Sequence, residues 1–231
     1  MQDFINSARN GNISEVKRRL DEGVRADSQN EAGDTALILA SQNGQKAVCE
    51  LLITRGCNVD MQNKDGGTAL ILSSQNGHKA VCELLITRGC NVHMQDKDGL
   101  TALMWASWNG HKAVCELLIT RGCNVDMKAN NGNTALIYAF CGGHEAVCEL
   151  LITRGCNLDM QNKDGTTALM CASYYCRIPI VISLIEAGCD YSLRDNKGKS
   201  AMDKLRERHP DKVEEVQVSR SPTAVVTHSL I

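Results

Sequence analysis

Residues 98–125 read DGLTALMWASWNGHKAVCELLITRGCNV, and the motifs of this stretch recur every 33 residues along the chain. In the same register, the tripeptide Thr-Ala-Leu begins at Thr35, Thr68, Thr101, Thr134 and Thr167. The octapeptide Leu-Leu-Ile-Thr-Arg-Gly-Cys-Asn begins at Leu51, Leu84, Leu117 and Leu150. Two motifs that stay in phase over most of the chain indicate tandem copies of one structural unit.

Each repeat contains the signals of two short helices separated by a tight turn. In one copy, Asp65-Gly66 predicts a turn, and Thr68 is placed to cap the first helix. Asn76-Gly77 predicts the end of that helix, because glycine tolerates the left-handed conformation found there. We expect a second helix over residues 80–87, with its apolar side chains on one face, and Gly89 ends it. An extended loop then leads to the next turn.

A single pair of such helices cannot bury its apolar face, whereas stacked pairs can, so the pattern predicts an all-α solenoid. The 33-residue period and the motifs Gly-x-Thr-x-Leu, Asn-Gly-His and Leu-Leu-x-x-x-Gly resemble those of the ankyrin-repeat family. The resemblance covers residues 3–218. It implies stacked helix-turn-helix units with finger loops, in which the first helices and the fingers line a concave surface that binds proteins.

The chain departs from the family pattern at the start of each first helix. Where the family has Thr-Pro-Leu-His, this sequence has Thr-Ala-Leu followed by an apolar residue: Ile38, Ile71, Met104, Ile137 and Met170. In the family, that histidine ties neighbouring turns together by hydrogen bonds. We therefore expect these bonds to be lost here or to be replaced by other groups.

The repeats become irregular towards both ends of the chain. We expect an N-terminal capping repeat over residues 1–26, tandem 33-residue repeats over 27–198 and a C-terminal capping half-repeat over 199–218. The end units have charged residues where internal repeats have apolar ones, as expected of elements with one face in water. Residues 219–231 lack periodicity, so we expect a flexible tail.

The composition argues against several classes of function. The net charge of −2 lacks the basic excess that is typical of nucleic-acid-binding proteins, so we expect no nucleic-acid partner. The polar N-terminal residues do not predict a signal peptide, and no apolar run is long enough to span a membrane. We expect a monomeric protein in the cytoplasm, with the nucleus as the alternative location.

Most of the 12 cysteines fall into two series at the repeat period. Equivalent positions in stacked repeats lie roughly 8–10 Å apart, whereas a disulfide needs Cα atoms within about 7 Å. We therefore interpret both series as buried, unpaired thiols: Cys49, Cys82, Cys115 and Cys148, and Cys57, Cys90, Cys123, Cys156 and Cys189. Three cysteines outside the series are candidates for a reactive thiol: Cys141, Cys171 and Cys176.

The polar residues do not combine into a catalytic or metal site. His78, His111 and His144 each precede a cysteine by four residues, but two ligands per repeat do not complete a tetrahedral site. The tripeptide Gly198-Lys199-Ser200 has Leu193 where a phosphate-binding loop needs its first glycine. The sequence thus predicts no catalytic residue, no metal and no cofactor, and we expect a protein that is not an enzyme.

Aromatic side chains gather on the first helices of the later repeats, among them Trp105, Trp108, Tyr138 and Tyr174. The residue before each repeat threonine also varies, and in one repeat it is Leu100. Variation among otherwise similar repeats thus falls on the surface that the resemblance assigns to binding. We predict that these five residues contact a protein partner. The alternative is that the earlier member of each helical pair packs between repeats and that the differences are drift after duplication.

The leading interpretation is an adaptor or scaffold that holds a protein partner on its concave face. A regulatory inhibitor that docks on an enzyme and blocks it is the alternative, because both would use the same surface. The chain also ends in Ser229-Leu230-Ile231, and a serine two residues before a hydrophobic terminus resembles a ligand of PDZ domains. Ser229 and Ile231 are therefore candidate contacts for a second partner.

Overall fold

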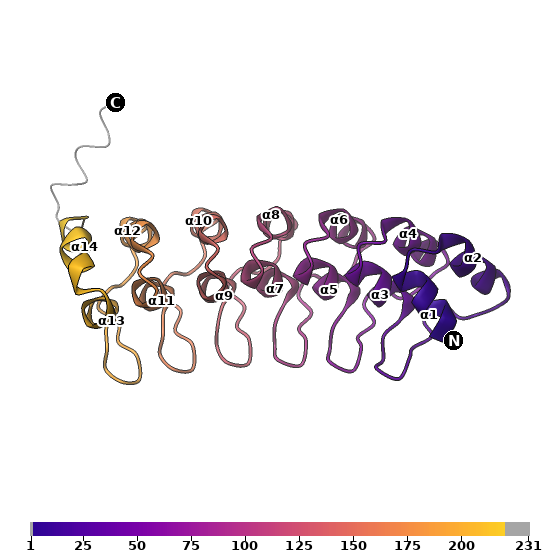
Figure 1. The fold of residues 1–231 in the computed structure, drawn as a ribbon, viewed down its shortest axis with the longest axis horizontal. Coiled ribbons are helices and arrows are strands. Elements are labelled where there is room, and N and C mark those ends of the chain that lie inside the picture. The colour runs from indigo at the N-terminus through magenta and orange to yellow at the C-terminus, as the bar shows by residue number, and fades with distance from the viewer. Residues whose placement is uncertain (1, 220–231) are drawn as a thin grey trace, which may run out of the picture.

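The computed structural model describes residues 2–219, which form an elongated stack of helix pairs in chain order (Figure 1). The first helices of the pairs are α1 (Gln2–Arg9), α3 (Ala36–Gln42), α5 (Ala69–Gln75), α7 (Ala102–Trp108), α9 (Ala135–Gly142), α11 (Ala168–Tyr174) and α13 (Ala201–Arg208). The second helices are α2 (Ile13–Asp21), α4 (Lys46–Thr54), α6 (Lys79–Thr87), α8 (Lys112–Thr120), α10 (Glu145–Thr153), α12 (Ile178–Glu186) and α14 (Val213–Ser219), the last preceded by the 3-10 turn η1 (Pro210–Lys212). The two sets form two layers, and long loops project beside the first layer (Figure 1). This arrangement confirms the predicted all-α solenoid.

Threonine fixes the start of each internal first helix. Thr101 Oγ1 accepts a hydrogen bond from the backbone N–H of Met104 at 3.3 Å, and the other repeat threonines cap their helices in the same way. The side chain thereby satisfies a backbone donor that the first turn leaves free. Helix α7 ends before Asn109, and Gly110 follows with a φ of +75°. The predicted start and stop signals are confirmed.

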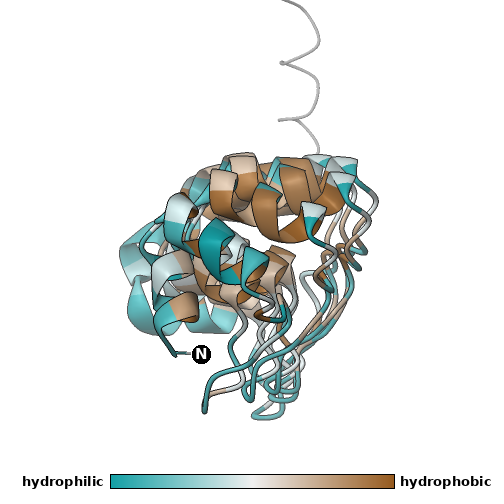
Figure 2. Ribbon diagram, turned by 90° about the vertical axis from the view of Figure 1, so that its right-hand side faces the viewer, coloured by the Kyte–Doolittle hydropathy of each residue, from teal (hydrophilic) through white to brown (hydrophobic). Residues whose placement is uncertain are grey.

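Small and aliphatic side chains fill the space within and between repeats. Leu103 and Met104 of α7, and Val114 and Leu118 of α8, are at most 2% exposed. Burying a large aliphatic side chain contributes about 1.5–3 kcal/mol, so apolar contact is the main force that holds the repeats together. Figure 2 shows hydrophobic residues continuing through the second-helix layer, with hydrophilic residues on the N-terminal helices in front.

Side-chain amides replace the turn-tying histidines that this sequence lacks. Gln62 Nε2 donates to the carbonyl oxygen of Gly66 in its own finger at 2.8 Å and to that of Gln95 in the next finger at 3.0 Å. Glutamines at the equivalent positions repeat both bonds: Gln29, Gln95 and Gln161. A backbone bond also joins neighbouring fingers, for example from Lys97 N–H to Asp65 O at 2.9 Å. The fingers are therefore tied to one another along the stack.

A series of aspartates forms a further set of bonds between repeats, and this series has one gap. Asp60 Oδ1 accepts from the backbone N–H of Asn91 at 2.9 Å, and Asp126 accepts from Asn157 at the same distance. Between them, His93 occupies the aspartate position. Within the described residues, the backbone N–H of Asn124 accordingly has no side-chain acceptor from the preceding repeat.

We expect His93→Asp to stabilise the protein by about 1 kcal/mol, because it restores a carboxylate acceptor for the Asn124 N–H. The midpoint of urea unfolding should rise. Asp126→His is the matched control, because it opens the same gap one repeat later and should lower the midpoint. A midpoint that does not change in the first variant would show that this aspartate series does not stabilise the stack.

One repeat has a strained residue where its sisters have glycine. Tyr175-Cys176 stands in place of Asn-Gly, and Cys176 adopts a φ of +56°. The left-handed region is costly for a residue with a Cβ atom, by about 1–2 kcal/mol. The glycines that follow the sister helices, Gly77 and Gly110, adopt the same conformation without this cost.

We expect Cys176→Gly to raise the free energy of unfolding by about 1 kcal/mol, measured by urea denaturation, because it relieves this strain. The opposite change, Gly77→Ala, is the control. It introduces a Cβ at a φ of +74°, only 2.6 Å from His111 Nδ1, and should destabilise the protein. A loss of stability in Cys176→Gly would mean that packing of the thiol outweighs the backbone strain.

Candidate functional site

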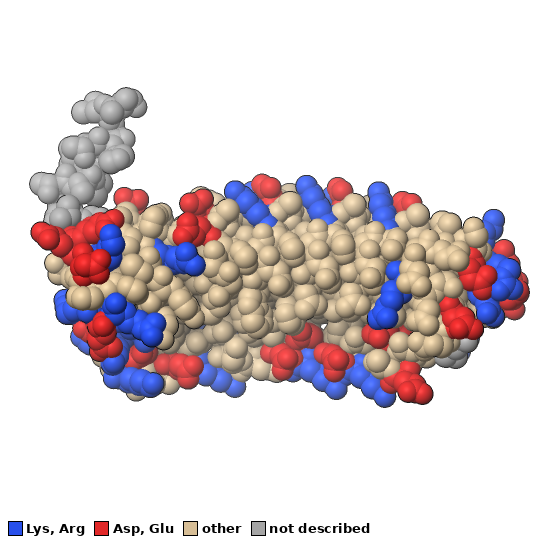
Figure 3. Space-filling model, viewed as in Figure 1, with Lys and Arg blue, Asp and Glu red and all other residues tan. Residues whose placement is uncertain are grey.

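Two positions on each first helix differ from repeat to repeat, and together they form one face of the stack. The earlier position holds Leu39, Leu72, Trp105, Tyr138, Cys171 and Lys204. The later position holds Gln42, Gln75, Trp108, Cys141, Tyr174 and Glu207. In Figure 3, the middle of the visible face is largely uncharged, and many acidic and basic side chains gather along the lower edge, where the fingers lie.

Three aromatic rings from two neighbouring repeats form one stack, which we call the aromatic stack: Trp105, Trp108 and Tyr138. The Trp105 and Trp108 ring centroids are 5.5 Å apart with an interplanar angle of 11°. Trp108 in turn stacks on Tyr138 of α9, with centroids 5.2 Å apart and an angle of 21°. The structure therefore brings together three of the five predicted binding residues.

Hydrogen bonds hold both ends of the aromatic stack. Trp105 Nε1–H donates to Asp96 Oδ2 at 2.7 Å, and the Tyr138 hydroxyl donates to Asn131 Oδ1 at 3.2 Å. Burial raises the pKa of Tyr138, so its hydroxyl stays protonated and able to donate. The middle ring, Trp108, is 41% exposed. The stack thus presents one accessible ring between two fixed ones.

The sequence does not identify Asp96 and Asn131 as part of this site. Both lie in finger loops, where polar residues are expected in any case. The one sequence signal comes from comparing the repeats. Two sister repeats have an asparagine at this finger position, Asn63 and Asn162, whereas this repeat has Asp96 there and a tryptophan nine residues later. A carboxylate can accept a bond from an indole N–H there, whereas the repeats with Asn63 and Asn162 have Leu72 and Cys171 at the tryptophan position.

The structure corrects the expectation that Leu100 and Tyr138 lie on the surface. Each is only 4% exposed, so neither presents much side chain to a partner. Leu100 lies beside Trp108 in a shallow hollow that Tyr138 also lines. Tyr138 is covered because Trp108 of the neighbouring helix stacks on its ring. Tyr138 therefore packs between repeats, as the alternative interpretation of the earlier positions expects.

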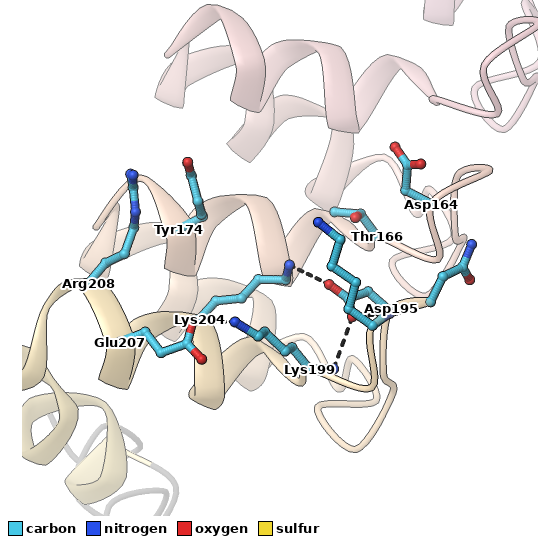
Figure 4. Close-up of a pocket in the computed structure, with 10 residues that line it drawn as sticks. Asp164, Thr166, Tyr174, Asp195, Lys199, Lys204, Glu207 and Arg208 are labelled. Atoms are coloured by element: carbon cyan, nitrogen blue, oxygen red, sulfur yellow. Dashed lines mark hydrogen bonds and ion pairs between the residues drawn. The ribbon is translucent and has the colours of Figure 1, made fainter.

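Tyr174 lies apart from the aromatic stack, near the C-terminal end. Its ring makes an edge contact with Tyr175 at 5.1 Å, and the Arg208 guanidinium lies 3.9 Å from its centroid. The surrounding pocket is polar, and Lys204 forms an ion pair of 2.6 Å with the buried Asp195 (Figure 4). Tyr174 is 38% exposed, so it remains accessible as a separate contact.

A second hollow runs along the N-terminal half of the same face. It is about 590 Å³ in volume and reaches from Arg9 to Trp105. Its acidic side chains, Asp34, Asp65, Asp96 and Asp98, outnumber Arg9 and Lys97. Trp105 borders this hollow, so the aromatic stack adjoins an acidic groove.

Two of the histidines before the second helices, His78 and His111, tie repeats together. His111 Nε2 lies 3.0 Å from the carbonyl oxygen of Gln75 in the preceding repeat, and His78 makes the equivalent contact with Gln42. Within residues 2–219, no group of three or more histidine, cysteine or acidic side chains is placed to hold a metal ion. These contacts give the histidines a role in packing.

The cysteines separate into two classes by exposure. Both repeat series are buried, as predicted, and burial raises the pKa of Cys90 and of Cys123 to about 12. Of the three other cysteines, Cys141 is exposed, Cys176 is half-buried and Cys171 is buried. Only Cys141 is therefore an open candidate for a reactive thiol.

Two sequence expectations concern the ends of the chain and its relation to membranes. Ser229 and Ile231, the candidate PDZ ligand, lie outside the described residues, as does most of the expected tail at 219–231. Among the described helices, none has the length and apolar character needed to cross a bilayer.

Comparisons with known proteins agree with the architecture. A family model for ankyrin repeats matches residues 4–96, 37–129, 79–162 and 103–195. The human ASB11 ankyrin repeat domain superposes with a TM-score of 0.83 at 21% identity, covering 95% of this chain and 98% of that one. The ankyrin repeat domain of Bcl-3, described as a unique member of the IkappaB protein family, gives 0.82 at 25% identity, covering 93% and 97%. No curated protein shows a significant match.

We expect Asp96→Asn to release one end of the aromatic stack and to lower the free energy of unfolding by about 1 kcal/mol. Asparagine keeps the finger-loop bonds, as Asn63 does, but its amide cannot accept from Trp105 while its oxygen serves the loop. Near-UV circular dichroism should lose intensity. Asp98→Asn removes a neighbouring charge without touching the indole, and it should leave the aromatic spectrum intact. An unchanged spectrum in Asp96→Asn would mean that stacking alone fixes the ring.

Proposed function

Because the chain belongs to the ankyrin-repeat family, we propose that it is a protein-binding module whose partner docks on the concave face over Trp108. The main support is the aromatic stack, in which an exposed indole is fixed between two rings that are themselves held by hydrogen bonds. Ankyrin repeats in general are interaction modules without catalytic function, and we assign no reaction to this chain.

The stack has the properties of an interface hot spot. Large aromatic side chains dominate hot spots because they bury much area while losing little rotational freedom. Trp108 has even less freedom to lose, since Trp105 and Tyr138 already hold its ring on both sides. Within the described residues, its indole N–H has no hydrogen-bond acceptor and remains available to a partner's carbonyl or carboxylate. Binding of a partner therefore requires little additional ordering of the Trp108 side chain, so this part of the entropic cost of association is small.

The surroundings of the stack suggest the character of the partner segment. An apolar side chain suits the ring of Trp108 and the hollow beside it, where Leu100 and Tyr138 form the floor. The acidic groove next to Trp105 favours polar or basic groups on one side of that anchor. We assign Leu100 and Tyr138 a supporting role and Tyr174 a second, separate contact.

An adaptor and an inhibitor would use the same face, so the distinction depends on the partner. We favour the adaptor, and affinity purification with mass spectrometry provides the first test. A partner that is recovered by the native chain and lost with a Trp108 variant occupies the proposed face. If that partner is an enzyme and loses its activity in the complex, the inhibitor is the correct description.

We expect Trp108→Gln to weaken binding of that purified partner by about 2 kcal/mol or more, measured by calorimetric titration. Glutamine occupies this position in two sister repeats, as Gln42 and Gln75, so the fold should be retained. The melting temperature should change little, because the ring is accessible and lies outside the core.

Two controls complete this experiment. Lys112→Ala changes an exposed residue of α8, in the other helical layer, and should affect neither binding nor stability. Trp105→Leu introduces the residue of the sister repeats and should lower both, because Trp105 supports the ring and packs between repeats. A lower melting temperature with unchanged affinity in Trp108→Gln would show that the ring only packs, and the proposed site would be abandoned.

A further inference from the structure

Two thiols meet at the interface between α9 and α11. Cys141 occupies the later position of α9, and Cys171 occupies the earlier position of α11. In the preceding interface, the same two positions hold Trp108 and Tyr138, whose rings stack at 5.2 Å. The repeat geometry thus directs these two side chains towards each other. Both line one hollow of about 180 Å³.

The two thiols differ in their access to solvent. Cys141 is exposed, whereas Cys171 is only 9% exposed and lies behind it. The hollow in front of them is also lined by Met170, Tyr174 and Tyr175. A small reagent can therefore reach Cys141 first. Cys171 is placed to react only with the adduct that the reagent forms on the Cys141 thiol.

The electrostatic surroundings favour the thiolate of the outer cysteine. Hydrogen bonding by the neighbouring Cys171 thiol lowers the pKa of Cys141 to about 7, below that of an ordinary thiol. The same contact, together with burial, raises the pKa of Cys171. The other titratable groups around the pair are Lys204 of α13, Tyr174 and Tyr175, which line the hollow, and the hydroxyl of Tyr138.

The nine cysteines of the two repeat series provide an internal contrast. They are buried in the stack, and burial raises the pKa of thiols such as Cys49 and Cys115 to about 11. Thiols of this kind are slow nucleophiles at neutral pH. Reactivity towards disulfides should therefore be concentrated outside both series, where Cys141 is the exposed thiol and Cys176 is half-buried.

We propose that Cys141 and Cys171 form a thiol–disulfide exchange site that is oxidised by small organic disulfides. The Cys141 thiolate attacks one sulfur of the reagent, which forms a mixed disulfide and releases the other half as a thiolate. Cys171 then loses its proton to solvent and attacks Cys141 Sγ, which releases the second half. Two protein thiols are oxidised to one disulfide, and one small disulfide is reduced to two thiols.

Oxidation at this site would change the concave face. The bond would link α9 to α11 covalently and would remove the exposed thiol that lies along the face between Trp108 and Tyr174. The two redox states would therefore differ in the rigidity of one repeat interface and in the surface available for binding. The chemical step itself does not depend on the proposed partner.

The test uses the folded chain and one molar equivalent of dithiobis(nitrobenzoate), an aromatic disulfide that releases a coloured thiolate. The proposal predicts two coloured equivalents per reagent molecule and a product lighter than the reduced protein by two hydrogens. Peptide mapping should find Cys141 joined to Cys171. The rate should rise with pH through about 7, because the thiolate of Cys141 is the attacking species.

Residues of the sister repeats supply matched variants. Cys171→Leu, the residue at Leu39 and Leu72, should release one equivalent and retain the reagent on Cys141. Cys141→Gln, the residue at Gln42 and Gln75, should lose the fast reaction. A stable mixed disulfide in the native chain, or a fast phase that persists in Cys141→Gln, would overturn the proposal. Mapping of the native protein decides the question even if a variant fails to fold.

Discussion

The structure depends on apolar contact between neighbouring repeats. No helix pair has a core of its own, so each buries its leucine, valine and cysteine side chains against the pairs on either side. Close approach requires small residues at the contacts, such as Ala106 and Ser107, both fully buried. This requirement explains why the internal repeats are near copies and why aromatic residues are rare, at 3% of the chain.

The same requirement leaves few positions free to change. Cores, caps and turns are fixed by burial and hydrogen bonding, whereas the two variable positions of each first helix lie at the margin of the interface. Substitutions at the later position alter the first-helix face without removing a core contact, whereas the earlier position is buried in several repeats, as at Leu39 and Tyr138. The later position tolerates glutamine, tryptophan, cysteine and tyrosine in turn. Three of these side chains are exposed: Trp108, Cys141 and Tyr174.

Local sequence rules predict the fold, but they do not predict the contacts among side chains on the first-helix face. Thr68 caps its helix and α6 spans Lys79–Thr87 against an expected 80–87, because these features depend on residues close in sequence. The burial of Leu100 and Tyr138 depends instead on how far one repeat overlaps the next, which no single repeat encodes. The bond from Trp105 to Asp96 joins a helix to a finger, and the only sequence signal for it is that an aspartate replaces asparagine in the repeat that has the tryptophan. The missing turn histidines indicate that another group must tie the fingers, but the sequence does not point to Gln62 as that group.

The interfaces on either side of α9 show how one geometry supports different chemistry. In both interfaces, the later position of one first helix lies beside the earlier position of the next. With two aromatic residues, Trp108 and Tyr138, this contact produces a stack. With two cysteines, Cys141 and Cys171, it brings thiols together in the following repeat. Because the backbone arrangement is set by the repeat core, a substitution at either position changes the chemistry of the face while the scaffold stays the same. A duplicated repeat can therefore acquire a new surface property through one pair of substitutions, provided that both fall at this contact.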